Sequence, residues 1–301
     1  MGFLEMLPSP WIDQPGALEK VESARIGEVE RSVARSLIET GLAVIRGLHK
    51  PDICEAVITD YQKYSAKNSD YVRANLDSLG RERRLTNFHR WSDAAMQIGT
   101  NPSIMSVLDF VFGYEASVYT SLTFKYGTQQ PVHRDTPHFA TWPRGYFVGV
   151  WTALESVNEN SGPLFYHPRA HRFAVEEAEF LDAAKKRIPG ASRSEQRLLA
   201  LDLYNGEIIR RATGIAEPVK LMADVGDTVI WHPEMPHGGS LAMRQMATRW
   251  STVFHYAPVL VQVHQHETFF AQDRAVEPET RYGYLEAYSR KIAEAGGVGF
   301  M

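Results

Sequence analysis

The chain has 301 residues, of which 44% are hydrophobic and 23% are charged, and its formal net charge is -4. A chain of this length and composition can bury a large core, which excludes disordered and fibrous proteins. Its slight acidity provides no basic surface for DNA, RNA or anionic lipid, so we expect a small-molecule partner rather than a nucleic acid or a membrane.

Cysteine usage and the N-terminus also limit the class of protein. The single cysteine, Cys54, excludes an internal disulfide framework. The first residues lack the basic start and apolar core of a secretory signal. No uninterrupted apolar run reaches the length of a membrane span. We therefore expect a cytoplasmic protein that forms a single domain over residues 1–301.

Residues 1–114 are predicted to be mostly helical, after a proline-rich and irregular arm over residues 1–25. Residues 65–99 are polar and basic, and their pattern favours no particular element. Within them, residues 87–91 form either a lid or wall of a substrate site, or a solvated loop anchored by two aromatic rings. The spacing of apolar residues predicts a helix over 27–40 that ends at Gly41, a strand over 42–47, a helix from Pro51, and a helix over 102–112.

From residue 115 onward the pattern becomes that of β-strands. We expect a core over 115–258, a helical pair inserted at 172–213, and a C-terminal helical part over 259–301 with an amphipathic helix at 282–295. Many antiparallel strands covered by helices indicate a mainly β fold with flanking helices (α+β), which holds a ligand in its mouth. Runs of β-branched and aromatic residues predict strands over 118–126, 146–154, 163–166, 217–222, 228–232 and 248–256.

Residues 132–136 contain an H-x-D motif. If this segment is extended, His133 and Asp135 point to the same face because side chains alternate along a strand. A distant histidine, His237, would add a third ligand. Two histidines and one carboxylate leave open positions on a metal, as in non-haem Fe(II) oxygenases. The chain has eleven histidines, so a surface pair or an aspartate that caps a turn remains the alternative.

The strand predicted over 248–256 carries two residues that could bind a carboxylate. Arg249 and Ser251 share a face by the same alternation. A guanidinium fork beside a hydroxyl suits a carboxylate that is bound through both of its oxygens. A structural ion pair is the alternative for Arg249.

The order of the motifs resembles that of the phytanoyl-CoA dioxygenase family of Fe(II)/2-oxoglutarate-dependent oxygenases. The shared pattern is H-x-D, a W-x-A-L strand with a Gly-Pro-Leu turn, G-D-x-x-x-x-H, H-G-x-S and a closing arginine, within residues 115–258. The resemblance implies a double-stranded β-helix (jelly-roll, cupin-like) core in which His133, Asp135 and His237 bind Fe(II).

The same resemblance implies that Arg249, assisted by Ser251, holds the distal carboxylate of 2-oxoglutarate. It also implies that Trp151 lines the cosubstrate pocket, with packing in the core as the alternative. His255 is expected to be an ordinary surface or core histidine. His232 is expected to hydrogen-bond locally, with the orientation of a ligand as the alternative. Five arginines could gather at the entrance and bind an anionic group, or lie on a solvated face; they are Arg83, Arg84, Arg90, Arg134 and Arg144.

The implied reaction uses O2 to hydroxylate an aliphatic carbon of a small-molecule metabolite, with release of succinate and CO2 from 2-oxoglutarate. Asp135 favours hydroxylation, since related halogenases are expected to have a small residue at that position. Desaturation, cyclisation and epimerisation stay open as outcomes. The alternatives are a non-redox metal-dependent hydrolase or isomerase on a jelly-roll scaffold, and a non-catalytic jelly-roll binding module.

Overall fold

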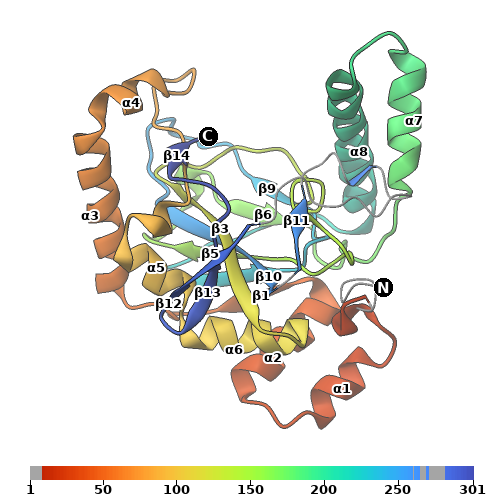
Figure 1. Cartoon of the computed structure of the whole chain (residues 1–301), viewed down its shortest axis with the longest axis horizontal. Coiled ribbons are helices and arrows are strands. Elements are labelled where there is room, and N and C mark those ends of the chain that lie inside the picture. The colour runs from red at the N-terminus through yellow and green to blue at the C-terminus, as the bar shows by residue number, and fades with distance from the viewer. Residues whose placement is uncertain (1–8, 260, 265–268, 271–281) are drawn as a thin grey trace.

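The structure is a computed structural model that describes residues 9–259, 261–264, 269–270 and 282–301 (Figure 1). Within these residues the largest sheet has nine strands in the order β1-β8-β5-β10-β3-β13-β12, with β2 also on β3 and β14 on β2. The strands are β1 (Leu42–Ile45), β2 (Leu85–Thr86), β3 (Ala116–Phe124), β5 (Val148–Ala153), β8 (Thr228–Trp231), β10 (Ser251–Pro258), β12 (Tyr284–Ala287), β13 (Arg290–Ala293) and β14 (Gly299–Phe300).

A smaller sheet packs against the inner face of the main sheet. Its strands run β7 (Val219–Lys220), β6 (Leu164–Tyr166) and β9 (His237–Gly239). Leu164 of β6 belongs to the same buried cluster as Trp151 of β5 and Val253 of β10, so apolar side chains fill the space between the sheets. A separate pair consists of β4 (Ala140–Thr141) and β11 (Val263–His264). The predicted jelly-roll core with flanking helices is confirmed.

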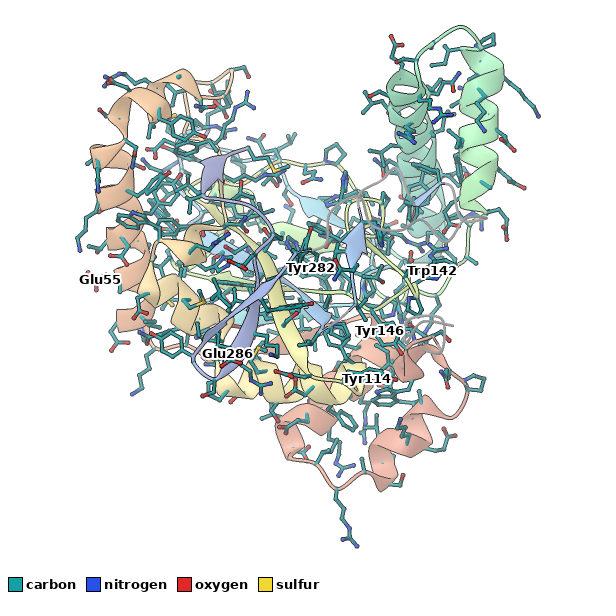
Figure 2. All side chains as sticks on the ribbon, viewed as in Figure 1. Glu55, Tyr114, Trp142, Tyr146, Tyr282 and Glu286 are labelled. Atoms are coloured by element: carbon teal, nitrogen blue, oxygen red, sulfur yellow. The ribbon has the colours of Figure 1, made fainter. Side chains whose placement is uncertain are left out.

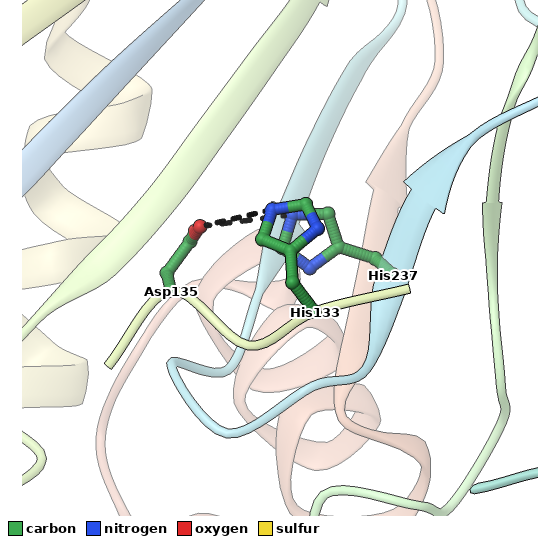
Figure 3. Close-up of side chains that lie close together, drawn as sticks. All are labelled: His133, Asp135 and His237. Atoms are coloured by element: carbon green, nitrogen blue, oxygen red, sulfur yellow. Dashed lines mark ion pairs between the residues drawn. The ribbon is translucent and has the colours of Figure 1, made fainter. Parts of the chain in front are cut away.

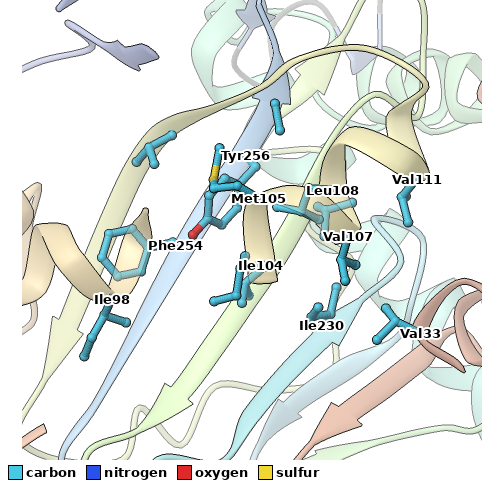
Figure 4. Close-up of a cluster of buried hydrophobic side chains, with 14 of the residues drawn as sticks. Val33, Ile98, Ile104, Met105, Val107, Leu108, Val111, Ile230, Phe254 and Tyr256 are labelled. Carbon is cyan, nitrogen blue, oxygen red and sulfur yellow. The ribbon is translucent and has the colours of Figure 1, made fainter. Parts of the chain in front are cut away.

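Helices cover the outer face of the main sheet. Strand alternation separates the two faces of β10. Phe254 and Tyr256 join the cluster beneath the helices (Figure 4), whereas Val253 lies between the sheets. On α3 the exposed Glu55 points away from the body (Figure 2), while Cys54 faces the core. The covering helices are α2 (Glu28–Thr40), α3 (Pro51–Lys67), α5 (Asp93–Gly99) and α6 (Pro102–Phe112).

The predicted helical pair is present as α7 (Glu177–Arg187) and α8 (Arg193–Ile215), which lie side by side and extend from the body (Figure 1). Ser192 starts α8 with a capping box, in which its hydroxyl accepts from the Glu195 amide and the Glu195 carboxylate accepts from the Ser192 amide. The predicted helix end at Gly41 is also confirmed, because Gly41 has a left-handed backbone with φ of 81°. Within the described residues, no helix combines the length and apolarity required to cross a bilayer.

Two predictions about the ends of the chain are wrong. Residues 282–295 form the antiparallel hairpin of β12 and β13 instead of a helix. Its turn residues Tyr288 and Ser289 have positive φ angles, and Ile292 pairs with Val118, so the edge of β3 outweighs the local helical preference. The N-terminal arm is not wholly irregular, since it contains η2 (Trp11–Asp13) and α1 (Ala17–Ser23).

The segment with no predicted element proves to be mostly regular. It contains the end of α3, then α4 (Ser69–Ala74), β2, η3 (Phe88–Arg90) and α5. Phe88 is buried and stacks with Trp91, with ring centroids 5.7 Å apart. A further short helix is η4 (Glu159–Ser161).

The cluster beneath the helices predicts where truncation destabilises the fold. Leu108 on α6 is 0% exposed, whereas Leu198 on α8 is 56% exposed. We expect Leu108→Ala to lower the free energy of unfolding by about 2–5 kcal/mol, because it leaves a cavity. Leu198→Ala is the matched control and should change that free energy by no more than about 0.5 kcal/mol. Urea denaturation measures both, and equal effects would contradict this description of the core.

Candidate metal centre

The structure brings the three predicted ligands together. His133, Asp135 and His237 are buried, and each offers an atom that lies within 4.8 Å of the others. Asp135 Oδ1 is 3.7 Å from His133 Nε2 and 3.8 Å from His237 Nε2 (Figure 3). Paired backbone hydrogen bonds of 2.9 Å and 3.0 Å join His133 and His237, so the loop of the H-x-D motif is tied to the start of β9.

The second ring nitrogen of each histidine fixes the tautomer. Nδ1 of His133 lies 2.9 Å from the Pro131 carbonyl oxygen, and Nδ1 of His237 lies 2.9 Å from the Met235 carbonyl oxygen. A carbonyl oxygen can only accept, so each Nδ1 carries the proton and donates it. The lone pair on each Nε2 is then left for a metal ion.

Trp231 orients the carboxylate of Asp135. Its indole Nε1 donates to Asp135 Oδ2 over 2.8 Å, which leaves Oδ1 facing the two histidines. Trp231 sits opposite Gly149 in the register of β5 and β8. A Cβ atom at residue 149 would lie 2.4 Å from the Trp231 ring, so only glycine leaves room for the indole at this position.

Burial and charge set the protonation states that metal binding requires. Burial alone would raise the pKa of Asp135, but His237, His255, His133 and the hydrogen bond from Trp231 outweigh it and lower that pKa to about 2. Burial, with a contribution from His237, lowers the pKa of His133 to about 3. At neutral pH the carboxylate is therefore charged and the His133 ring is neutral, as ligands must be.

The triad opens into a cavity of about 420 Å³. Apolar and aromatic side chains form much of its wall, and polar groups gather at a few points. The residues of the wall are Arg84, Thr86, Asn87, Tyr119, Thr120, Leu122, Phe124, Thr128, Gln130, His133, Asp135, His138, Phe139, Trp151, Leu164, Trp231, His237, Gly238, Gly239, Arg249, Val253, His255, Ala295 and Met301.

Arg249 is a buried cation in this wall, with 3% of its surface exposed. Its Nη1 donates to the Gly162 carbonyl over 3.1 Å, and its guanidinium lies 5.9 Å from the ring centroid of Trp151. Burial lowers the pKa of Arg249 to about 10, which still leaves it charged at neutral pH.

The polar atoms near Arg249 are not all satisfied. Nε of Arg249 and Nε1 of Trp151 are buried and have no hydrogen-bond partner within the described residues. In that part of the chain Arg249 also has no carboxylate partner, so the structural ion pair is not found. Leaving a buried cation and two N–H groups without acceptors costs free energy, which an anionic ligand would recover.

Ser251 shares the strand of Arg249 but has a different contact. Its hydroxyl is buried and donates to the Arg249 carbonyl over 3.3 Å, and Ser251 is not part of the cavity wall. Its contact with a cosubstrate carboxylate stays a prediction.

Some residues of the site were not found from the sequence. His255 was expected to be an ordinary histidine, yet it is buried in the cavity wall with its ring 4.2 Å from that of Phe139. Alternation along β10 could have found it, because His255 is an even number of residues from Arg249. His232 makes the expected local hydrogen bond, in which its Nδ1 accepts from the Glu234 amide over 3.2 Å, and its Nε2 also pairs with Asp13 over 3.0 Å, far away in the sequence. The cluster 87–91 contributes Asn87 to the cavity wall.

A model of the phytanoyl-CoA dioxygenase (PhyH) family matches residues 37–242. The peroxisomal phytanoyl-CoA dioxygenase of Mus musculus is 26% identical over 139 residues, which cover 46% of this chain and 35% of that protein. The Homo sapiens protein of the same name is 24% identical over 117 residues, which cover 37% of this chain and 28% of that protein. The chain thus aligns with about a third or less of the length of these relatives.

Solved structures share the fold over most of the chain. The non-heme alpha ketoglutarate dependent carbocyclase SnoK from nogalamycin biosynthesis has a TM-score of 0.61 at 16% identity, covering 93% of this chain and 99% of its own. EctD from S. alaskensis with 2-oxoglutarate and 5-hydroxyectoine has a TM-score of 0.59 at 14% identity, covering 85% of this chain and 84% of its own. The epimerase SnoN with Fe3+ and alpha ketoglutarate has a TM-score of 0.57 at 16% identity, covering 93% and 99%. At such low identity these likenesses show the fold alone.

The contact between Trp231 and Asp135 can be tested by its effect on metal affinity. Trp231→Phe keeps an aromatic ring but removes the hydrogen bond that orients the carboxylate. We expect the affinity for Fe(II) to fall by about 10–100-fold, measured by anaerobic titration of the metal-free protein. Trp91→Phe changes an exposed indole outside the cavity wall and serves as the control. An unchanged affinity in Trp231→Phe would show that this bond does not support the centre.

Proposed function

This chain belongs to the phytanoyl-CoA dioxygenase family, and from that premise we propose that it is an Fe(II)- and 2-oxoglutarate-dependent dioxygenase. The observation that supports this most directly is the buried set of His133, Asp135 and His237 in a cavity that also contains Arg249, a buried cation without an acidic partner among the described residues. A metal-dependent hydrolase or isomerase, or a passive binding module, has no use for that cation.

Each side chain then has a defined part. Nε2 of His133, Nε2 of His237 and Oδ1 of Asp135 would hold Fe(II) on one face. Arg249 would bind the distal carboxylate of 2-oxoglutarate, with Trp151 beside it and Ser251 assisting. When bound, Fe(II) and 2-oxoglutarate supply the chemistry that activates O2, with release of succinate and CO2.

The protein itself excludes water from the site and orients the metal ligands. Apolar side chains of the wall, among them Leu164 and Val253, exclude water from the reacting groups. The two carbonyl contacts at Nδ1 and the Trp231 contact at Asp135 hold the ligands in place, so little reorganisation is required when metal binds.

Hydroxylation of an aliphatic carbon of a small-molecule metabolite is the proposed outcome. The carboxylate of Asp135 occupies the position that halogenases are expected to leave to a small residue, and this supports hydroxylation over halogenation. The structural relatives are named as a carbocyclase and an epimerase as well, so analysis of the product distinguishes hydroxylation from ring closure and epimerisation.

The organisation of the chain and its location belong to the same proposal. We propose one catalytic domain over residues 1–301, because helices before residue 114 and strands of the 115–258 core share one hydrophobic cluster. A cytoplasmic location stays a prediction from the sequence, and the curated relatives are named as peroxisomal proteins.

Loss of the metal ligands should abolish complex formation. We expect the protein with Fe(II) and 2-oxoglutarate, without oxygen, to develop a weak visible charge-transfer band. His133→Ala, Asp135→Ala and His237→Ala should each abolish the band and the release of succinate in air, because each removes one of three ligands. Asp182→Ala, at an exposed position on α7, should keep both. A band that persists in the three variants would refute the assignment.

Loss of the buried cation Arg249 should weaken the binding of 2-oxoglutarate. We expect Arg249→Ala to raise KM for 2-oxoglutarate by about 30-fold or more, equivalent to the ~2 kcal/mol or more for truncating a buried charge pair, while kcat at saturation changes much less. Arg249→Lys should have a KM between those of the wild type and Arg249→Ala, since lysine keeps the positive charge but lacks the forked guanidinium. Arg210→Ala, in an exposed ion pair on α8, is the control. An unchanged KM in Arg249→Ala would remove Arg249 from the scheme.

A further inference from the structure

A second arginine lines the cavity. Of the five arginines that could gather at the entrance, Arg84 alone is in the cavity wall. Arg134 is buried and pairs with Glu234 over 2.9 Å, and Arg144 pairs with Glu177 over 2.6 Å. Arg90 donates to the Gly296 carbonyl, and Arg83 is exposed and does not line the cavity. Of these five arginines, Arg84 is therefore the one that a ligand in the cavity can reach.

The sheet register places Arg84 away from Arg249. Arg84 directly precedes β2. In this strand Leu85 is fully buried in the cluster beneath the helices, whereas Thr86 lines the cavity. Thr86 lies opposite Leu122 of β3, and Leu122 lies opposite Val253 of β10. Arg84 therefore lies on the far side of β3 from the strand that follows Arg249, so the two cations serve different parts of the cavity.

The guanidinium of Arg84 has no partner among the residues that the structure describes. Within the part of the chain that the structure describes, it makes no hydrogen bond or ion pair, and the charge acting on it is that of Asp135. Burial lowers the pKa of Arg84 and Asp135 raises it, but an arginine in this setting stays charged at neutral pH. A half-buried cation that faces a cavity and is unpaired within the described ranges favours an anionic ligand.

The charges of the loaded site leave Arg84 unbalanced. Fe(II) would bring two positive charges and 2-oxoglutarate two negative ones, while Asp135 and Arg249 add one of each sign, so these four groups sum to zero. Asp135 is the only acidic residue among the described residues of the wall. No side chain of the described wall is left to offset the charge of Arg84 in this loaded site, so an anionic group on the primary substrate, the remaining occupant of the cavity, would offset it.

The neighbouring wall suits an apolar body. Tyr119 and Phe139 meet edge to face with ring centroids 6.3 Å apart, and Phe139 also lies against His255. The C-terminal residues Ala295 and Met301 close this side, and the Met301 amide donates to the Arg84 carbonyl over 3.1 Å. At about 420 Å³ for cosubstrate and substrate together, the cavity is near the lower end of the usual range for ligand sites. The part of the substrate that reacts is therefore small.

We propose that Arg84 binds a carboxylate of the primary substrate, which is a small carboxylic acid whose apolar body lies against Tyr119 and Phe139. The planar fork of arginine matches both oxygens of a carboxylate. This inference rests on the proposed function, because it takes the Arg249 side of the cavity as the cosubstrate site.

The test compares acids with their neutral counterparts on the intact chain. Short alkanoates and arylalkanoates, each paired with its primary amide, are titrated into the oxygen-free complex with Fe(II) and 2-oxoglutarate. Calorimetry and the shift of the visible band report binding without turnover. The variants are Arg84→Gln and Arg84→Lys. The matched control is Arg83→Ala, because Arg83 is the exposed neighbour on the same segment and does not line the cavity.

We expect the best acids to bind at least about tenfold more tightly than their amides to the wild type and to Arg83→Ala, which corresponds to ~1.4 kcal/mol. Arg84→Gln should lose this preference and Arg84→Lys should keep part of it. The affinity for 2-oxoglutarate should be unchanged in all of these variants, which separates Arg84 from Arg249.

Several results would overturn the inference. They are no preference for acids in the wild type, an equal preference in Arg84→Gln, or a loss of 2-oxoglutarate affinity in Arg84→Gln. Tighter binding of arylalkyl phosphates than of any carboxylate would also overturn the assignment of a carboxylate. If instead the wild type forms no visible band with Fe(II) and 2-oxoglutarate, the proposed function itself fails. Failure of the inference and failure of the function are thus distinguishable.

Discussion

The candidate site depends on the pair of backbone hydrogen bonds between His133 and His237. His133 lies on a loop and His237 is the first residue of β9, so their pairing brings the H-x-D motif to the start of that strand. Without it, the three ligand atoms would not share one point, and the buried charge of Asp135 would have no histidines to offset its loss of hydration. The jelly-roll core gives the loop of His133 and the strand of His237 a common rigid support.

Three charged side chains, those of Asp135, Arg249 and Arg84, lie at different places along the inner face of the main sheet. Trp231 and Gly149 meet at the end where Asp135 is held. Arg249 lies just before β10, and Arg84 lies just before β2 on the other side of β3. Between them the wall is mainly apolar, which strengthens each electrostatic contact because little water competes with it. The fold therefore holds three charged side chains, those of Asp135, Arg249 and Arg84, at separate places around one cavity.

The sequence alone was sufficient to predict the jelly-roll core and the candidate site residues that belong to one local pattern. Alternation within H-x-D and along the strand of Arg249 depends only on neighbours in the chain, so these residues could be identified directly. The contact of Trp231 with Asp135, the space left by Gly149 and the isolation of Arg84 depend on cross-strand register, which local patterns do not contain. A helix was predicted over 282–295, where the structure has the hairpin of β12 and β13. The pairing of this hairpin with the edge of β3 is a tertiary feature, which the local pattern does not contain.

The central claim is that these three side chains hold one iron ion beside a buried arginine that receives the cosubstrate. A crystal structure of the protein prepared without oxygen, with Fe(II) and 2-oxoglutarate, tests it most directly. The account predicts iron bound to Nε2 of both histidines and to Asp135 Oδ1, with the distal carboxylate of 2-oxoglutarate on Arg249. Iron bound elsewhere, or a cosubstrate that does not reach Arg249, would contradict it.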